Sequence, residues 1–169
     1  DDGVARAEKV DFSYNYMENR QVVVVKKDAK VTSVADLKGK KVSIGAPGSG
    51  VYFNAVDVLT AAGLTEADIN AQYQSFADSA DALKDGKIDA AFIVAGPPTP
   101  AITELCTTNA AYLVPIDGDV ATKLMKKCPF YTEHVIPAGT YPEQKEDIKT
   151  VTVKATLIVS ASASEDDVY

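Results

Sequence analysis

A glycine-rich loop between a predicted strand and a predicted helix constrains the fold of this chain most strongly. The strand is predicted over residues 40–45, KKVSIG, and the loop APGSG follows over residues 46–50. Apolar residues then recur at helical spacing over residues 51–62, so a helix should begin near Ser49 and end at Gly63. Free N–H groups at the start of a helix carry partial positive charge and can bind a carboxylate or a phosphate. The loop therefore predicts an anion site, with the Ser49 hydroxyl at its rim.

The same loop also has a purely structural interpretation. Strand–glycine–helix turns are common in α/β domains because the chain must turn between elements. Ser49 can then act only as the N-cap of the helix.

Strands and helices alternate along the rest of the chain. Strands are predicted at residues 21–25, 72–75, 88–94, 110–116 and 151–160, and helices at residues 76–85, 100–106 and 117–127. This alternation predicts an α/β fold with a mostly parallel central sheet flanked by helices. Residues 128–141 contain proline and are predicted to be irregular.

Two loops of this pattern should meet at one edge of the sheet. The first is APGSG, and the second is AGPPTP, residues 95–100, which follows the apolar strand IDAAFIV. Ligands of such sheets bind at the carboxyl ends of the strands. If the two strands are neighbours, Ser49, Gly50, Gly96 and Pro97 converge on one crevice.

Composition excludes several classes of partner. The chain has 169 residues, of which 46% are apolar, so it can bury a core. Its net charge of −7 argues against nucleic acid, because phosphate binding needs a basic face. No apolar run approaches the ~18 residues of a membrane span.

The side chains that could perform catalysis or bind a metal are sparse. Cys106 and Cys128 are too few for a metal site, and they are either two free thiols or a disulfide between the ends of two helices. The loop APGSG lacks the lysine of a phosphate-transferring enzyme, and the only histidine, His134, lies far from it in sequence. We therefore expect neither an enzyme nor a bound cofactor or metal.

Several segments together resemble the TAXI-type substrate-binding proteins of TRAP transporters. They are DLKGKKVSIGAPGSG at residues 36–50, DALKDGKIDAAFIVAGPPTPAITEL at residues 81–105, and HVIPAGTY at residues 134–141. The resemblance implies one lobe of the type II periplasmic-binding-protein fold. It also implies capture of a small carboxylate or an amino acid such as glutamate, and docking on membrane permease subunits. The implied location is periplasmic or extracytoplasmic, with a lipid anchor on the full-length protein as one form of it.

The N-terminal stretch resembles a different family with the same fold. Residues 5–42, ARAEKVDFSYNYMENRQVVVVKKDAKVTSVADLKGKKV, are similar to the polar amino-acid-binding receptors of ABC transporters. In that family an arginine before the FS-x-x-Y strand grips the carboxylate of the substrate, and Arg6 stands at that position. An ABC receptor is therefore the alternative function. From another class, the ligand-sensing effector domain of a transcription regulator shares the lobe architecture.

The resemblance implies both a division of the chain and a set of ligand-binding residues. Residues 1–30 would be a hinge strand and a remnant of the first lobe, residues 31–150 the second lobe, and residues 151–169 a returning hinge strand with the start of the first-lobe return. The N–H groups of Gly50 and Val51 would bind carboxylate oxygens beside Ser49. Tyr52 would stack on the ligand, and Gly96 and Pro97 would shape the opposite wall. Arg6 would pair with the carboxylate, and Tyr141 would reach the hinge or the ligand.

Overall fold

The computed structural model describes residues 10–12, 17–96, 98–108, 111–155 and 158–160. The chain divides into two compact units, one formed by Asp1–Glu18 with Lys154–Tyr169 and the other by Asn19–Val153. The assignment of these units to the lobes of a receptor stays a prediction.

The smaller unit contains one pair of short strands. β1 (Val10–Phe12) pairs antiparallel with β9 (Ile158–Ser160), with Val10 opposite Ser160. The strand predicted over residues 151–160 corresponds to the end of β8 (Ile148–Ala155) and to β9, and residues 156–157 between them lie outside the described residues.

The larger unit is built on one mixed sheet, in which neighbouring strands follow the order β4-β3-β5-β2-β8-β7 and β6 also pairs with β2. Strand β3 runs parallel to β4 and β5, whereas β2 runs antiparallel to β5 and β6, and β7 antiparallel to β8. The α/β fold with helices flanking a central sheet is confirmed. The expected mostly parallel sheet is wrong, because β2 in its middle pairs antiparallel with β5 and β6, and β7 pairs antiparallel with β8. The strands are β2 (Met17–Lys26), β3 (Lys41–Ser43), β4 (Asn70–Gln72), β5 (Ala90–Ala95), β6 (Ala111–Val114), β7 (Tyr131–Ile136) and β8 (Ile148–Ala155).

Strand β2 is buried on both faces of the sheet. Its run of four valines is β-branched, which favours the pleated strand. Val22 and Val24 pack into one hydrophobic cluster, while Val23 and Val25 pack into the other. This alternation shows that the two clusters lie on opposite faces of the sheet.

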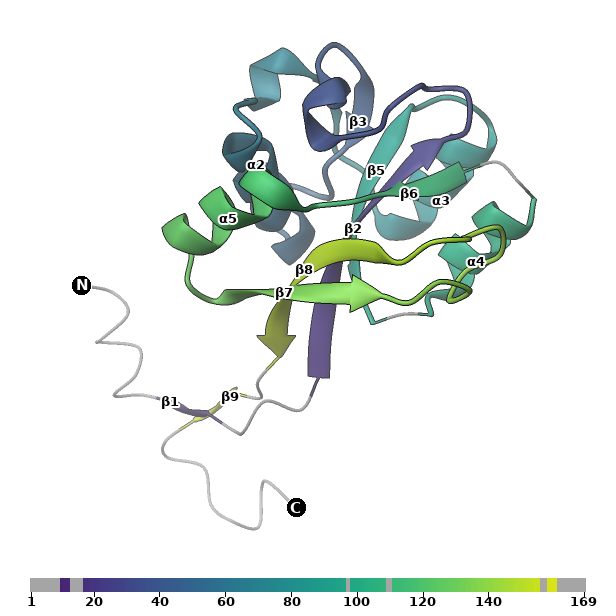
Figure 1. Cartoon of the computed structure of the whole chain (residues 1–169). Coiled ribbons are helices and arrows are strands. Elements are labelled where there is room, and N and C mark those ends of the chain that lie inside the picture. Colours follow the sequence, from purple (N-terminus) through teal and green to yellow (C-terminus); the bar gives the residue numbers. More distant parts are fainter. Residues whose placement is uncertain (1–9, 13–16, 97, 109–110, 156–157, 161–169) are drawn as a thin grey trace. The chain divides into compact units, whose positions relative to one another are not determined.

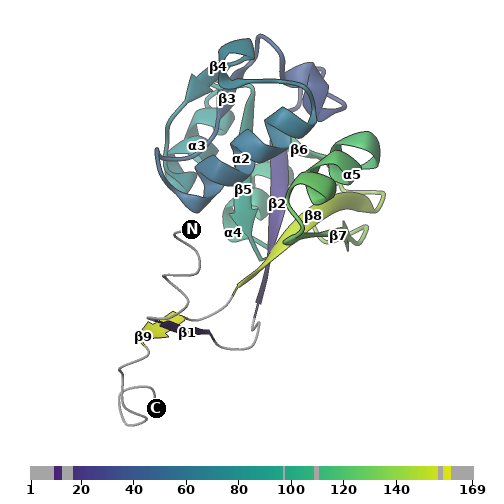
Figure 2. The same cartoon turned by 90° about the vertical axis from the view of Figure 1, so that its left-hand side faces the viewer.

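Helices cover both faces (Figure 1). Apolar residues of α2, α5 and η1 belong to the cluster of Val23, and those of α3 and α4 belong to the cluster of Val22. Figure 2 shows α2 and α5 together from a second direction. The helices are η1 (Val34–Leu37), α2 (Gly50–Ala61), η2 (Glu66–Asp68), α3 (Phe76–Lys84), α4 (Pro100–Thr107) and α5 (Gly118–Lys127).

Residues 128–141 are not irregular throughout, because β7 occupies the middle of this segment. Pro129 and Pro137 flank the strand and do not interrupt its hydrogen bonds. The Tyr131 ring is buried, and its hydroxyl donates to the Asn54 carboxamide on α2 and lies 3.3 Å from the Asp57 carboxylate. Burial and the nearby carboxylate raise the pKa of Tyr131, so the phenol stays protonated and keeps this contact.

We predict that Leu59→Ala destabilises the larger unit, because Leu59 on α2 is fully buried in the core. The free energy of unfolding should fall by about 2–5 kcal/mol in a urea titration. The exposed neighbour Thr60 provides the control, and Thr60→Ala should stay within about 0.5 kcal/mol of wild type. Equal losses for the two variants would show that α2 does not pack as described.

Candidate functional site

A cavity opens where the parallel strands β4, β3 and β5 end. Because these strands point the same way, the loops that follow them leave from one edge of the sheet. The cavity has a volume of about 270 Å³. Its lining residues come from these loops, from the end of β5 and from the starts of the helices: Gly45, Ala46, Ser49, Val51, Gln74, Ser75, Phe76, Ser79, Phe92, Ile93, Val94 and Thr99.

The cavity lies where α2, α3 and α4 begin. Ser49, Ser75 and Thr99 are the N-caps of these helices, and each lines the cavity. The N-terminus of a helix carries partial positive charge from its free N–H groups. The convergence therefore gives the cavity a positive potential without a charged side chain.

The loop before α2 has the backbone that the sequence predicts. Gly45 and Gly48 have φ values of +85° and +76°, which glycine adopts readily. Ser49 accepts a hydrogen bond from the N–H of Tyr52 at 3.2 Å, so it is the expected N-cap. Within the part of the chain that the structure describes, the N–H groups of Gly50 and Val51 have no hydrogen-bond partner. These groups are available to an anion.

The three helix starts are not equivalent electrostatically. Neither α2 nor α4 has an acidic residue in its first turn. In α3 the Asp78 carboxylate accepts a hydrogen bond of 2.6 Å from the Ser75 hydroxyl and offsets the local positive charge. An α-helix that starts with Pro100 also has one N–H fewer to offer. The start of α2 is therefore the helix start whose positive charge is least offset.

The structure brings several of the sequence-predicted residues to this cavity. Ser49 and Val51 line it, and exposed Gly50 lies between them. Gly96 lies at the end of β5, where its carbonyl accepts a hydrogen bond of 3.2 Å from the hydroxyl of Thr99. Ser49 and Thr99 line the cavity from the two loops expected to meet, whereas Gly50 and Gly96 are not among its lining residues.

The two predicted tyrosines make contacts elsewhere. The Tyr52 hydroxyl donates to Glu66 at 3.1 Å, and this hydrogen bond raises the pKa of Tyr52. Tyr141 is buried, and its hydroxyl accepts from the N–H of Thr99 at 3.3 Å. Tyr141 thus holds the loop before α4, and a ligand contact for either tyrosine stays a prediction. The predicted residues Arg6 and Pro97 lie outside the described residues.

The loop between β4 and α3 contributes a wall that the sequence analysis missed. Gln74 lines the cavity, and its buried Oε1 atom has no hydrogen-bond partner. Ser79 also lines the cavity, and its buried hydroxyl oxygen lies 2.7 Å from that of buried Ser43. The pattern of Ser75 followed by Asp78 marks a helix start, and it could have identified this third loop once β4 was placed parallel to β3.

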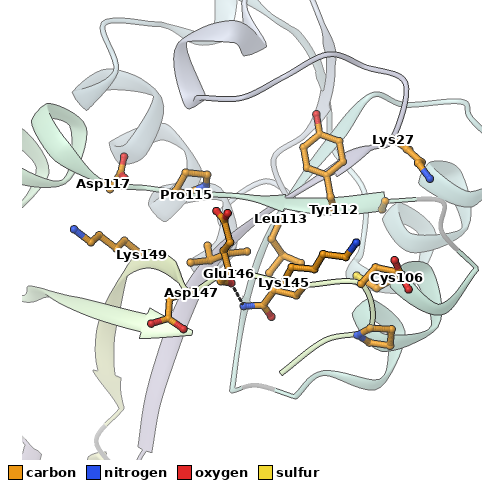
Figure 3. A pocket seen from close by; sticks show the side chains of 15 residues that line it. Lys27, Cys106, Tyr112, Leu113, Pro115, Asp117, Lys145, Glu146, Asp147 and Lys149 are labelled. Carbon is orange, nitrogen blue, oxygen red and sulfur yellow. Dashed lines mark hydrogen bonds between the residues drawn. The ribbon is translucent and has the colours of Figure 1, made fainter. Parts of the chain in front are cut away.

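A second, larger cavity has a volume of about 690 Å³. Figure 3 shows its lining side chains, most of which come from β6, from the residues that follow it and from the segment between β7 and β8. Lys27, which follows β2, Cys106 on α4 and Lys149 on β8 also line it. Exposed charges of both signs line it, namely Lys27, Lys145, Lys149, Asp117, Glu143, Glu146 and Asp147. This mixture selects neither an anion nor a cation, so the cavity at the helix starts is the better candidate.

Both cysteines are free thiols, so the disulfide alternative is wrong. Cys106 packs into the cluster of Val22 and Cys128 against the cluster of Val23, which lie on opposite faces of the sheet. Among the described residues, no group of His, Cys, Asp and Glu could hold a metal ion. No helix in the same residues is long and apolar enough to cross a bilayer.

Most of this chain matches a known protein family. The sequence pattern of the NMT1-like family matches residues 10–169. The chain belongs to the NMT1-like family.

Solved structures show which fold this NMT1-like chain shares. A putative periplasmic sulfonate-binding protein of an ABC transporter from Methylobacillus flagellatus KT has 18% identity over 89% of this chain and 38% of that chain, with a TM-score of 0.52. The periplasmic aliphatic sulphonate-binding protein SsuA from Escherichia coli has 24% identity over 66% of this chain and 35% of that chain, with a TM-score of 0.49. An ancestral arginine-binding protein bound to glutamine has 24% identity over 74% of this chain and 61% of that chain, with a TM-score of 0.48.

The first likeness shows the fold, which is an α/β lobe of the periplasmic-binding-protein type. The NMT1-like chain spans only 38% and 35% of the lengths of the two sulfonate-binding proteins.

We predict that Gly45→Ala disrupts the loop before α2 more than Gly48→Ala does. A Cβ atom at Gly45 would lie 2.8 Å from the Cβ atom of Val51, whereas at Gly48 nothing lies within 4 Å. Both variants put an L-residue at positive φ, at a cost of about 1–2 kcal/mol, and only Gly45→Ala adds a steric clash of about 1–3 kcal/mol. Urea unfolding should show this difference, and equal losses would contradict the described packing of Val51 on the loop.

Proposed function

We propose that this chain is the ligand-binding lobe of an extracytoplasmic solute receptor that captures a small organic anion for a membrane transporter. The observation that carries the proposal is the cavity that the N-cap residues of α2, α3 and α4 line together. Ser49 has a hydroxyl that can donate to an anion while its oxygen still caps α2. The N–H groups of Gly50 and Val51 complete a set of donors for acidic oxygens.

The lining of the cavity favours binding over catalysis. Of the described residues, those that line it include no histidine, cysteine, lysine or carboxylate, so none can act as a general base or activate a nucleophile. Its walls are largely apolar, with Val51, Phe76 and Phe92 among them. Such a cavity suits an anion with an apolar body, which receptors hold without changing it.

The class of transporter is a finer part of the proposal. The similarity to a putative ABC-transporter sulfonate-binding protein favours an ABC-type system, as does the N-terminal resemblance to amino-acid receptors. The TRAP system, which the TAXI-like segments favour, is the alternative. In both systems a second lobe would close over the ligand, and the closed receptor would dock on membrane permease subunits outside the cytoplasm.

We predict that small organic anions raise the melting temperature of this chain through the cavity. The panel is glutamate, succinate, pentanoate and pentanesulfonate, tested by thermal shift. A ligand at 100 times its Kd stabilises the folded state by about 2.7 kcal/mol. Ser49→Ala should reduce the shift, because loss of one charge-assisted hydrogen bond weakens binding by about 1.5–3 kcal/mol.

Ser33→Ala is the matched control, because Ser33 is the N-cap of η1 and bonds Asp36. It removes a capping hydroxyl from a loop that does not line the cavity. Its ligand-induced shift should equal that of wild type. No shift with any anion would overturn the proposed function, and equal shifts for wild type and Ser49→Ala would remove Ser49 from the site.

A further inference from the structure

Two neighbouring residues of β2 bury hydrogen-bond donors that have no acceptor. The Nε atom of Arg20 and the Nε2 atom of Gln21 are buried and lack a hydrogen-bond partner. Gln21 is only 2% exposed. Across the described part of the chain, Arg20 also forms no ion pair. Arg20 as a residue is only partly buried, but a buried donor without an acceptor costs free energy at either position.

The strand register places both residues at the edge where the cavity opens. Arg20 lies opposite Ala95 and Gln21 opposite Val94 at the carboxyl end of β5. Val94 lines the cavity. The opposite end of β2, at Lys26, lies next to β6. The two donors are therefore at the ligand edge of the sheet.

Neither Arg20 nor Gln21 is among the residues that line the cavity, which borders their strand through Ile93 and Val94 of the neighbouring β5. By the alternation of the strand, Gln21 shares a face with Val94, and Arg20 shares a face with Ile93. Both Val94 and Ile93 line the cavity, which therefore extends around the end of β5. A ligand head group that extends from the cavity past the end of β5 would approach Gln21 on one face of β2 and Arg20 on the other.

We propose that Arg20 and Gln21 bind the acidic head group of the ligand, together with the start of α2. This inference rests on the proposed function, and it adds the charge partner and the ligand class. The ligand is a carboxylate or a sulfonate with an apolar body. Guanidinium binds the oxygens of both head groups in a planar fork, and the carboxamide of Gln21 donates one further hydrogen bond. The body of the ligand lies against the apolar wall that contains Phe76 and Phe92.

The proposal explains why this part of the chain tolerates unpaired donors. The buried donors lower the stability of the empty protein, and an acidic ligand would supply the missing acceptors. Gln74 can take part from the opposite wall, because a carboxamide can present either its oxygen or its NH₂ group.

The test measures the Kd of pentanesulfonate and pentanoate by calorimetry on the full 169-residue chain. Arg20→Gln should weaken the binding of both anions about 10- to 100-fold. Arg20→Lys keeps the charge and should recover part of the affinity. The Kd of the neutral analogue pentanamide should change little in either variant. The ratio of anion affinity to pentanamide affinity should therefore fall in Arg20→Gln, which removes the charge, much more than in Arg20→Lys, which keeps it.

Lys26→Gln is the matched control, because it removes the same charge from the other end of the same strand. Lys26 pairs with Asp28 at 3.3 Å and lies away from the cavity. Its Kd values should equal those of wild type.

Gln21→Met separates a binding role from a structural one. It keeps the length of the side chain and removes the unpartnered donor, so it should raise the melting temperature of the empty protein and still weaken anion binding. If Gln21 has only a structural role, Gln21→Met should lower the melting temperature and leave the Kd of the anions unchanged.

The outcomes distinguish this inference from the proposed function. If wild type and Arg20→Gln bind the anions with the same Kd, the inference is overturned and the proposed function still stands. Loss of affinity in Arg6→Gln but not in Arg20→Gln would assign the charge contact to Arg6 instead. Wild type that binds neither anion would overturn both.

Discussion

The parallel alignment of β3 between β4 and β5 is the constraint on which the rest of the structure depends. Parallel neighbours end at the same edge of a sheet, so each following loop and each following helix must start there. The core holds this alignment in place, because Val42 and Ile44 around β3 are completely buried beneath α2. The cavity is therefore a direct consequence of strand order, and the helix starts converge without any residue being selected to bring them together.

Electrostatic potential at this edge comes from backbone and not from clustered charge. The described residues of the cavity wall include no ionised side chain, while Ser49 marks a helix start with free N–H groups. Arg20 and Gln21 add donors that the protein itself does not satisfy. A protein that is selected only for stability has no reason to keep such groups, because a methionine or leucine would pack there at lower cost. Their presence at the ligand edge is easiest to understand as part of binding.

Tyrosine hydroxyls fix the loops around this scaffold. Tyr112 donates to the carbonyl of Val31, Tyr131 donates to Asn54 on α2, and the Tyr141 hydroxyl accepts from the N–H of Thr99. Each contact joins segments that are far apart in sequence, and each ring is partly or completely buried. Tyrosine is often found in ligand contacts, yet in this structure Tyr131 and Tyr141 hold α2 and the loop before α4 beside the cavity, and Tyr112 holds Val31 near the other end of β2. Their role is to reduce the freedom of those segments, which is a requirement for a preformed site.

The amino-acid sequence by itself determined the local features: the buried strand of valines, the turn at Gly45, the N-cap at Ser49 and the alternation that gives an α/β fold. These depend on residues within a few positions of one another, so propensity and spacing are sufficient to predict them. The sequence did not predict β7, the separate pairing of β9 or the third wall at Gln74, and it left open whether Cys106 and Cys128 are free. It also drew attention to Arg6 and not to Arg20. Only the tertiary structure decided these features, because strand pairing, burial and the distance between remote side chains depend on contacts that no local pattern encodes.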